Sequence, residues 1–367
     1  MKPPLPCSPD AEFSMPRLAS VSILLLAFAS GTVLAQPKDL FKGAVIDPSQ
    51  ADADFSLQGE YVGYLAPPNQ TWQQVGLQVV ALGGGKFDAV LYTGGLPGAG
   101  WDGRTKEKLS GGGEPEGTFL RDAGKTVSLA NGWARVFMTG GRELGTLARI
   151  HRESPTMGAA PLPGARVLFD GRNTDQFTGG ELAPDGTLLA GVLTKMLVHD
   201  FRMHLEFRTP YMPQARGQGR GNSGVYIQQR YEVQILDSFG LNGVDNECGG
   251  LYKQTAPAVN MCLPPLAWQT YDIWFTAARF AADGKTKIAN ARITVLHNAV
   301  PIHSNREITA KTGGGKVEGP EDFPINLQDH GNPVTFRNIW LINHVADAVS
   351  LPCPAPRQVF SRHRRCR

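Results

Sequence analysis

Short runs of alternating apolar and polar residues, each ended by Gly, Asn or Asp, recur along most of this chain. Alternation with a period of two places successive side chains on opposite faces of a strand. The clearest runs are Ser223–Gln228 and Tyr231–Leu236, which a tight turn joins. Amphipathic helical periodicity is almost absent, so the pattern predicts an all-β protein.

A proline-rich segment at residues 153–164, with Pro155, Pro161 and Pro163, divides the strands into two groups and is predicted to be a linker. Before it, residues 40–152 indicate a small antiparallel β domain. After it, residues 165–343 contain eight or more short strands, which is typical of a jelly-roll-like sandwich of two sheets. The expected strands of this second unit lie near 165–169, 203–208, 223–228, 231–236, 268–277, 291–296, 325–328 and 335–342.

The two ends of the chain differ from its body. Residues 1–35 are predicted to be a leader and a secretory signal peptide, because a short basic region is followed by an apolar run and by small residues before Gln36. The apolar run is too short for a membrane span. We therefore expect a secreted or periplasmic protein without a transmembrane segment.

The tail at residues 344–367 carries five arginines and one aspartate, whereas the net charge of the whole chain is only +3. The body is therefore close to neutral, which gives no basis for binding nucleic acid through a basic surface. The proline-rich start of the tail predicts a disordered terminus.

Four cysteines follow the predicted cleavage site, namely Cys248, Cys262, Cys353 and Cys366. Export favours oxidation, and Cys248 and Cys262 enclose a short loop rich in turn residues. We predict a disulfide between these two, worth about 2–4 kcal/mol. A zinc site is disfavoured, because there is no CxxC pair and no histidine at ligand spacing.

The strand at 231–236 places Glu232 and Gln234 on one face, since Val233 and Ile235 take the other. The spacing to Asp237 is similar to the Glu-x-Asp-x-x-Glu run of sandwich-fold glucanases. In those enzymes a bulge turns the third acid onto the same face, whereas a regular strand would put Asp237 opposite Glu232. The alternative interpretation of these residues is a solvated outer face that carries an ordinary polar pair.

The strand at 203–208 places His204, Glu206 and Arg208 on one face. If this strand neighbours the strand at 231–236, Glu206 would lie beside Glu232, where two carboxylates could serve as acid and base or hold a cation. A surface ladder of salt bridges is the alternative interpretation.

His330 lies in an Asp-His-Gly-Asn turn after a strand. Histidine changes its charge near pH 7 and so makes a good proton donor to a leaving oxygen, although such a turn needs no catalytic role. Tyr252 and Arg337 offer donors for sugar hydroxyls, although each is more often structural.

Seven ordered motifs resemble the 3-keto-disaccharide hydrolase domain family, which has a concanavalin-like sandwich. The resemblance covers residues 165–342 and does not include the N-terminal domain. The motifs are Val167–Gly171, Asp200–Arg208, Gly221–Tyr226, Tyr231–Ser238, Gly250–Tyr252, Trp268–Tyr271 and Leu327–Trp340.

The resemblance implies cleavage of a glycoside whose sugar carries a ketone at C3. The ketone acidifies the C2 proton, so that a base can remove it and the oxygen at C1 can leave. We assign Glu232 as the base and His330 as the acid. Asp237 and Glu206 are further candidates as catalytic residues or cation ligands. Gln234, Asn222 and Gln328 are candidate partners of the enolate or of sugar hydroxyls. The expected substrate-binding residues are Asn222, Tyr252, Gln328, Asn332 and Arg337.

Carbohydrate is thus the expected substrate, with a divalent cation as a possible cofactor. The chain has no Gly-x-Gly-x-x-Gly between a strand and a helix, so a separate sugar-oxidising oxidoreductase is expected to make the ketone. The alternative is a non-catalytic carbohydrate-binding module, because lectin-like domains use the same sandwich.

Overall fold

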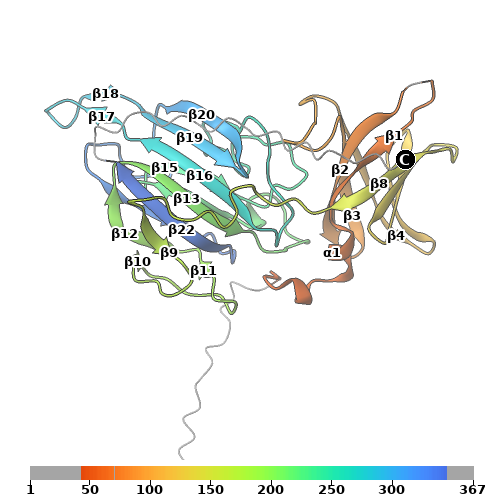
Figure 1. Cartoon of the computed structure of the whole chain (residues 1–367), viewed down its shortest axis with the longest axis horizontal. Coiled ribbons are helices and arrows are strands. Elements are labelled where there is room, and N and C mark those ends of the chain that lie inside the picture. Colours follow the sequence, from red (N-terminus) through yellow and green to blue (C-terminus); the bar gives the residue numbers. More distant parts are fainter. Residues whose placement is uncertain (1–42, 70, 345–367) are drawn as a thin grey trace, which may run out of the picture. The chain divides into compact units, whose positions relative to one another are not determined.

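The computed structural model describes residues 43–69 and 71–344. The predicted signal peptide and almost the whole of the predicted tail lie outside these residues. The regular secondary structure of the described part is nearly all strand, which confirms the all-β prediction (Figure 1). Its one α-helix is the single turn α1 (Ala53–Leu57), and short 3-10 helices lie at Pro48–Gln50 and Gly217–Gly219. None of the described helices is long and apolar enough to cross a membrane.

Eight antiparallel strands close into a barrel, because β1 pairs with β8 as well as with β2. Apolar side chains such as Leu77, Leu120 and Val136 fill its interior. The sequence predicted a small antiparallel β domain here, but not the closure of its strands into a barrel. The strands are β1 (Gly59–Leu65), β2 (Gln73–Gly83), β3 (Lys86–Thr93), β4 (Lys106–Glu114), β5 (Gly117–Arg121), β6 (Lys125–Ala130), β7 (Trp133–Met138) and β8 (Glu143–Ile150).

The second unit is a sandwich of two sheets, as predicted. The five-stranded sheet has the order β10-β12-β21-β14-β15, and the seven-stranded sheet has the order β11-β22-β13-β16-β19-β20 with β9 beside β22. Strands β22, β13, β16 and β19 lie side by side in Figure 1. The strands of the five-stranded sheet are β10 (Phe177–Thr178), β12 (Val192–Val198), β14 (Ser223–Ile227), β15 (Tyr231–Ile235) and β21 (Phe323–Leu327).

The strands of the seven-stranded sheet are β9 (Arg166–Phe169), β11 (Leu188–Leu189), β13 (Asp200–Arg208), β16 (Gln269–Thr276), β19 (Ala291–His297), β20 (Val300–Ile308) and β22 (Thr335–His344). A small separate hairpin is formed by β17 (Arg279–Phe280) and β18 (Lys287–Ala289).

The core of the sandwich lies between the two sheets. Met203 and Leu205 of β13 point into it from one sheet, and Val233 and Ile235 of β15 point into it from the other. Because strand side chains alternate, the intervening residues of β13 and β15 point away from the core, toward the two outer faces of the sandwich. Those two faces hold the polar residues that the sequence singled out.

Candidate functional site

Glu232 and Gln234 lie on the outer face of the five-stranded sheet, as their alternation with Val233 predicts. They are nevertheless only 4% and 1% exposed, so this face is not the open one that the sequence suggested. A loop pairs with the free edge of β15: the Tyr252 N–H donates to the Glu232 carbonyl, and the Gln234 N–H donates to the Gly250 carbonyl. The loop therefore closes the edge of the sheet beside this buried polar site.

Gly224 on the neighbouring strand β14 makes room for the carboxylate of Glu232. A Cβ atom at this position would lie 2.4 Å from Glu232 Oε1, closer than any real contact. Tyr226, directly opposite Glu232 across the two strands, places its hydroxyl within hydrogen-bond reach of the same carboxylate. The glycine and the tyrosine together fix where the carboxylate lies.

Burial raises the pKa of Glu232 to about 7, against the opposing effect of the hydrogen bond from Tyr226. Burial and the nearby charge of Glu232 also raise the pKa of Tyr226, so the phenol keeps its proton. A carboxylate with a pKa near neutrality can both take up and release a proton at physiological pH. A perturbed carboxyl group of this kind is typical of a functional site.

Three amide side chains come from the same part of the five-stranded sheet as Glu232, and one further amide orients two of them. Gln218 Oε1 accepts hydrogen bonds from Gln234 Nε2 at 3.0 Å and from Asn222 Nδ2 at 3.3 Å. The side-chain oxygens of Asn222, Gln234 and Gln328 are buried and have no hydrogen-bond partner in the described part of the chain. Such oxygens require donors, which the hydroxyl groups of a sugar would supply.

The sequence did not predict Gln218 or Tyr226 as site residues. Tyr226 follows the same alternation as Glu232 and could have been found from it. Gln218 lies in a 3-10 helix of three residues, which is too short for its sequence to indicate the direction of a side chain.

The loop after β21 carries two further predicted residues. Asn332 Oδ1 accepts a hydrogen bond from the Asn222 N–H at 2.8 Å, so Asn332 positions the start of β14. His330 is exposed, and among the described residues no hydrogen bond to its side chain is seen. Its role as the acid stays a prediction.

Glu206 does not join Glu232, and this prediction was wrong. Its strand β13 pairs with β16 and β22 of the seven-stranded sheet, whereas Glu232 belongs to the five-stranded sheet. Glu206 is 1% exposed on the outer face of its own sheet. It accepts hydrogen bonds from the Gly158 N–H at 2.6 Å, from Arg337 Nε at 2.6 Å and from Asn338 Nδ2 at 2.9 Å.

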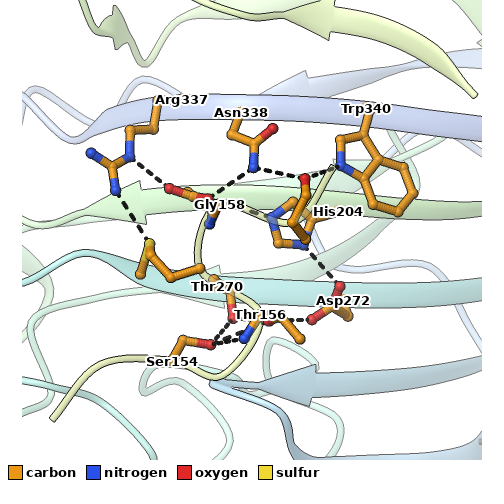
Figure 2. A network of polar contacts seen from close by, with 12 residues as sticks. Ser154, Thr156, Gly158, His204, Thr270, Asp272, Arg337, Asn338 and Trp340 are labelled. Carbon is orange, nitrogen blue, oxygen red and sulfur yellow. Dashed lines mark hydrogen bonds and ion pairs between the residues drawn. The ribbon is translucent and has the colours of Figure 1, made fainter. Parts of the chain in front are cut away.

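The predicted linker covers this second face. We call residues 154–159 the covering segment; its contacts with β13, β16 and β22 are shown in Figure 2. Thr156 Oγ1 donates to Asp272 Oδ2 at 2.8 Å, and the Ala159 carbonyl accepts from Trp340 Nε1 at 3.1 Å. His204 lies beneath it, 2.8 Å from Asp272 Oδ1 and stacked on Trp340. The linker is therefore a packed part of the sandwich.

Burial by itself would raise the pKa of Glu206, but the nearby His204 imidazole and the hydrogen bonds from Asn338, Arg337 and the Gly158 N–H outweigh it and lower the pKa to about 2. Burial would also lower the pKa of His204, but its hydrogen bond to Asp272 and the Glu206 carboxylate 3.7 Å away raise it. This group of charges is internally paired, which suits a structural role rather than proton transfer.

Arg337 was predicted to bind substrate, but the structure places it away from Glu232. Its guanidinium donates to Glu206 and lies over the ring of Trp268, 4.1 Å from the centroid. Asp237 also lies apart from Glu232. Strand β15 ends at Ile235, and the Asp237 carboxylate accepts from Arg220 Nε at 2.6 Å. Neither Glu206 nor Asp237 is free to act as a base or a cation ligand.

Cys248 and Cys262 are buried free thiols, so the predicted disulfide is not formed. Each sulfur has its own polar partners. The Cys248 sulfur lies 3.3 Å from the hydroxyl of Tyr271, and the Cys262 thiol donates to the Leu236 carbonyl at 3.5 Å.

The oxygens of Glu232 and the three amides are the groups of this site that could contact a hard cation. Within residues 43–69 and 71–344, no group of three or more His, Cys, Asp or Glu side chains is arranged to hold a metal ion.

The fold and the buried polar face define a concanavalin-like β-sandwich with a carboxylate and amides on one sheet. Residues 164–342 match the model of the 3-keto-alpha-glucoside-1,2-lyase-like domain, and this part of the chain belongs to that family. The sequence motifs predicted the same family over residues 165–342. None of the curated proteins gives a significant match.

Three solved structures from Parabacteroides distasonis ATCC 8503, each described as a putative glycosyl hydrolase, are similar to this chain. The first, at 2.13 Å resolution, is 32% identical, with 49% of this chain and 84% of that chain covered and a TM-score of 0.46. The second is 19% identical, with 50% and 95% covered and a TM-score of 0.36. The third is 20% identical, with 49% and 99% covered and a TM-score of 0.34.

Proposed function

We propose that this protein is a carbohydrate-active enzyme that cleaves the glycosidic bond of 3-keto glycosides, by base-initiated elimination followed by addition of water. The observation that carries the proposal is the buried carboxylate of Glu232, whose pKa is raised to about 7, beside three unpartnered amide oxygens. The family description, which names a lyase acting on 3-keto-alpha-glucosides, supports the same reaction class.

In the first step Glu232 removes the proton from C2 of the sugar, and the electron pair of the C–H bond forms an enolate with the C3 ketone. The Tyr226 hydroxyl, which lies beside Glu232, can donate to the developing negative charge. The bond from C1 to the leaving oxygen then breaks, and we assign His330 to protonate that oxygen. Water subsequently adds across the resulting C1–C2 double bond.

The three amides have a more limited role than the sequence suggested. Asn222 Nδ2 donates to both the carbonyl and Oε1 of Gln218, and Gln234 Nε2 donates to the same Oε1. The buried atoms of Asn222, Gln234 and Gln328 that have no partner among the described residues are acceptors. Acceptors bind sugar hydroxyls and do not stabilise an enolate. We therefore assign Asn222, Gln234 and Gln328 to binding and orienting the sugar.

A carbohydrate-binding module is the second candidate, since amide oxygens and tyrosines also suit sugar binding without catalysis. The raised pKa of Glu232 favours the enzyme. Burying an ionisable carboxyl group costs stability, and a neutral sugar can be bound without that cost.

The substrate proposal is tested by incubating the protein with paired ordinary and 3-keto glucosides. We expect release of the aglycone from the 3-keto compound and not from its ordinary counterpart, measured by chromatography. The assay is repeated after chelation and after divalent metals are added back, to find whether a cation contributes. Binding of both compounds without turnover of either would leave only the binding module.

The pH dependence of the reaction should follow the ionisation of Glu232. A base acts in its deprotonated form, so kcat/KM is expected to rise with pH and to level off above about pH 7, where Glu232 is ionised. The measurement is a profile of kcat/KM from about pH 5 to about pH 9, a range that extends about two units to each side of the pKa of Glu232. A profile that is flat across this range would exclude Glu232 as the base.

We further propose that the protein is exported and acts after a separate sugar-oxidising oxidoreductase. Supporting this are the basic, apolar and small-residue regions of residues 15–35 and the need for a ketone before the C2 proton becomes acidic.

A further inference from the structure

One stretch of chain contacts both the barrel and the site around Glu232. We call residues 211–222 the bridging segment; they follow β13 and lead into β14. The segment begins among barrel residues and ends at Asn222, one of the amides of the site. Its contacts therefore connect a domain without an assigned role to the proposed sugar-binding atoms.

At its first end the segment is anchored in the barrel. Tyr211 is 1% exposed and belongs to the apolar cluster that fills the barrel interior. Its backbone N–H and carbonyl pair with those of Val45 at 2.8 and 3.0 Å, and its hydroxyl donates to Asp52 Oδ1 at 2.7 Å. Tyr211 is thus a sandwich residue held by three hydrogen bonds to the chain that precedes the barrel strands.

The middle of the segment is held by the end of β2. Arg216 Nη2 donates to the Leu82 carbonyl at 3.1 Å, and Arg220 Nη1 donates to the Ala81 carbonyl at 3.2 Å. Arg220 is 5% exposed and also pairs with Asp237, which follows β15. Backbone atoms of the barrel therefore fix the segment on both sides of Gln218.

At its other end the segment orients the site. Gln218 Nε2 donates to the Asn246 carbonyl at 2.8 Å, which turns Gln218 Oε1 toward the NH₂ groups of Gln234 and Asn222. An acceptor placed at both NH₂ groups sets the rotation of both amides, because each amide then directs its oxygen away from Gln218. Those are the oxygens left without a partner.

We infer that the barrel orients the sugar-binding amides through the bridging segment, with Tyr211 and Gln218 as positioning residues. The inference rests on the proposed function only for what the amide oxygens bind. Loosening the barrel end of the segment lets Gln218 move, and Gln234 and Asn222 can then rotate and lose their fixed acceptors.

Two matched variants test the inference in the full-length protein. Tyr211→Phe removes the hydroxyl bond to Asp52 and keeps the ring in the barrel core. Tyr61→Phe, the control, removes an equivalent bond of a tyrosine that is also 1% exposed. The Tyr61 hydroxyl donates to the Leu57 carbonyl at 2.7 Å, and neither residue belongs to the bridging segment. Hydrogen exchange measured by mass spectrometry should be faster over residues 216–222 in Tyr211→Phe and unchanged there in Tyr61→Phe.

Enzyme kinetics should separate Tyr211→Phe from the control Tyr61→Phe in the same way as hydrogen exchange. On 3-keto glucoside, Tyr211→Phe and Gln218→Met are expected to raise KM about threefold to tenfold, the effect of one lost hydrogen bond, with little change in kcat. Tyr61→Phe should keep the wild-type KM. Equal exchange or equal KM in the two tyrosine variants would overturn the inference. If the wild-type protein turns over no 3-keto glycoside, the proposed function fails, and the exchange comparison still decides on the positioning role.

Discussion

Glu232→Gln is expected to lower turnover of 3-keto glucoside by about 10²-fold or more, because the amide keeps the shape of the side chain but cannot accept the C2 proton. The fold should survive. At pH 8 the variant should even have a higher thermal midpoint than the wild-type protein. The buried carboxylate of the wild type is ionised at that pH, which costs stability, whereas glutamine carries no charge. The measurements are kcat from initial rates and the thermal midpoint at two pH values.

The sign of the stability effect follows from the pKa of Glu232, which is about 7 in the folded protein against an ordinary value of 4.5. The unfolded chain releases the proton first, so the wild-type protein loses stability as pH rises from about 4.5 to about 7. The advantage of the variant should therefore be present at pH 8 and absent at pH 4. Glu116→Gln, at an exposed turn, is the control and should change neither quantity. Wild-type turnover in Glu232→Gln would show that another group is the base.

Glu206→Gln is expected to destabilise the protein by about 1–3 kcal/mol, because the buried side chain loses its charge-assisted hydrogen bonds, while its partner Arg337 is 40% exposed and can be solvated. The loss leaves Arg337 without its carboxylate and His204 without one of its two acidic neighbours. The measurement is equilibrium unfolding in denaturant, together with kcat of the folded protein, which should stay close to the wild-type value. A loss of turnover without a loss of stability would instead return Glu206 to the catalytic candidates.

Unfolding at low pH should also show how much the Glu206 carboxylate contributes to stability. The pKa of Glu206 is about 2 in the folded protein, below its ordinary value of 4.5, so the stability that it gives is present above about pH 4.5 and is lost as pH falls toward 2. Glu206→Gln has no carboxyl group to protonate here, so it should not show this loss of stability as pH falls. Glu143→Gln, which breaks an exposed pair with Arg135, is the matched control and should change stability little.

Strand periodicity predicted which way each side chain points and not which strands are neighbours. Alternation correctly placed Glu232 and Gln234 together on a face away from the core, and it correctly separated Glu206 from Met203 and Leu205. It could not show that β13 and β15 belong to different sheets, because that depends on crossovers between strands distant in the sequence. The error about Glu206 arose there.

The contacts that the sequence missed are made by atoms that carry no sequence signal. The covering segment binds Glu206 through the N–H of Gly158 and binds Trp340 through the carbonyl of Ala159. Every non-proline residue has both groups, so composition showed only a proline-rich spacer. The cysteine spacing was likewise compatible with a disulfide, and only the structure shows separate partners for Cys248 and Cys262.

The covering segment also limits how this part of the gene can change in length. Spacers between domains normally tolerate insertions and deletions, because nothing depends on their register. Here the addition of one residue between Thr156 and Ala159 would move the Gly158 N–H away from Glu206 or pull Thr156 from Asp272. Randomising the length of residues 154–159 in a library should therefore recover very few folded clones, whereas the same treatment of the exposed turn between β4 and β5 should recover many.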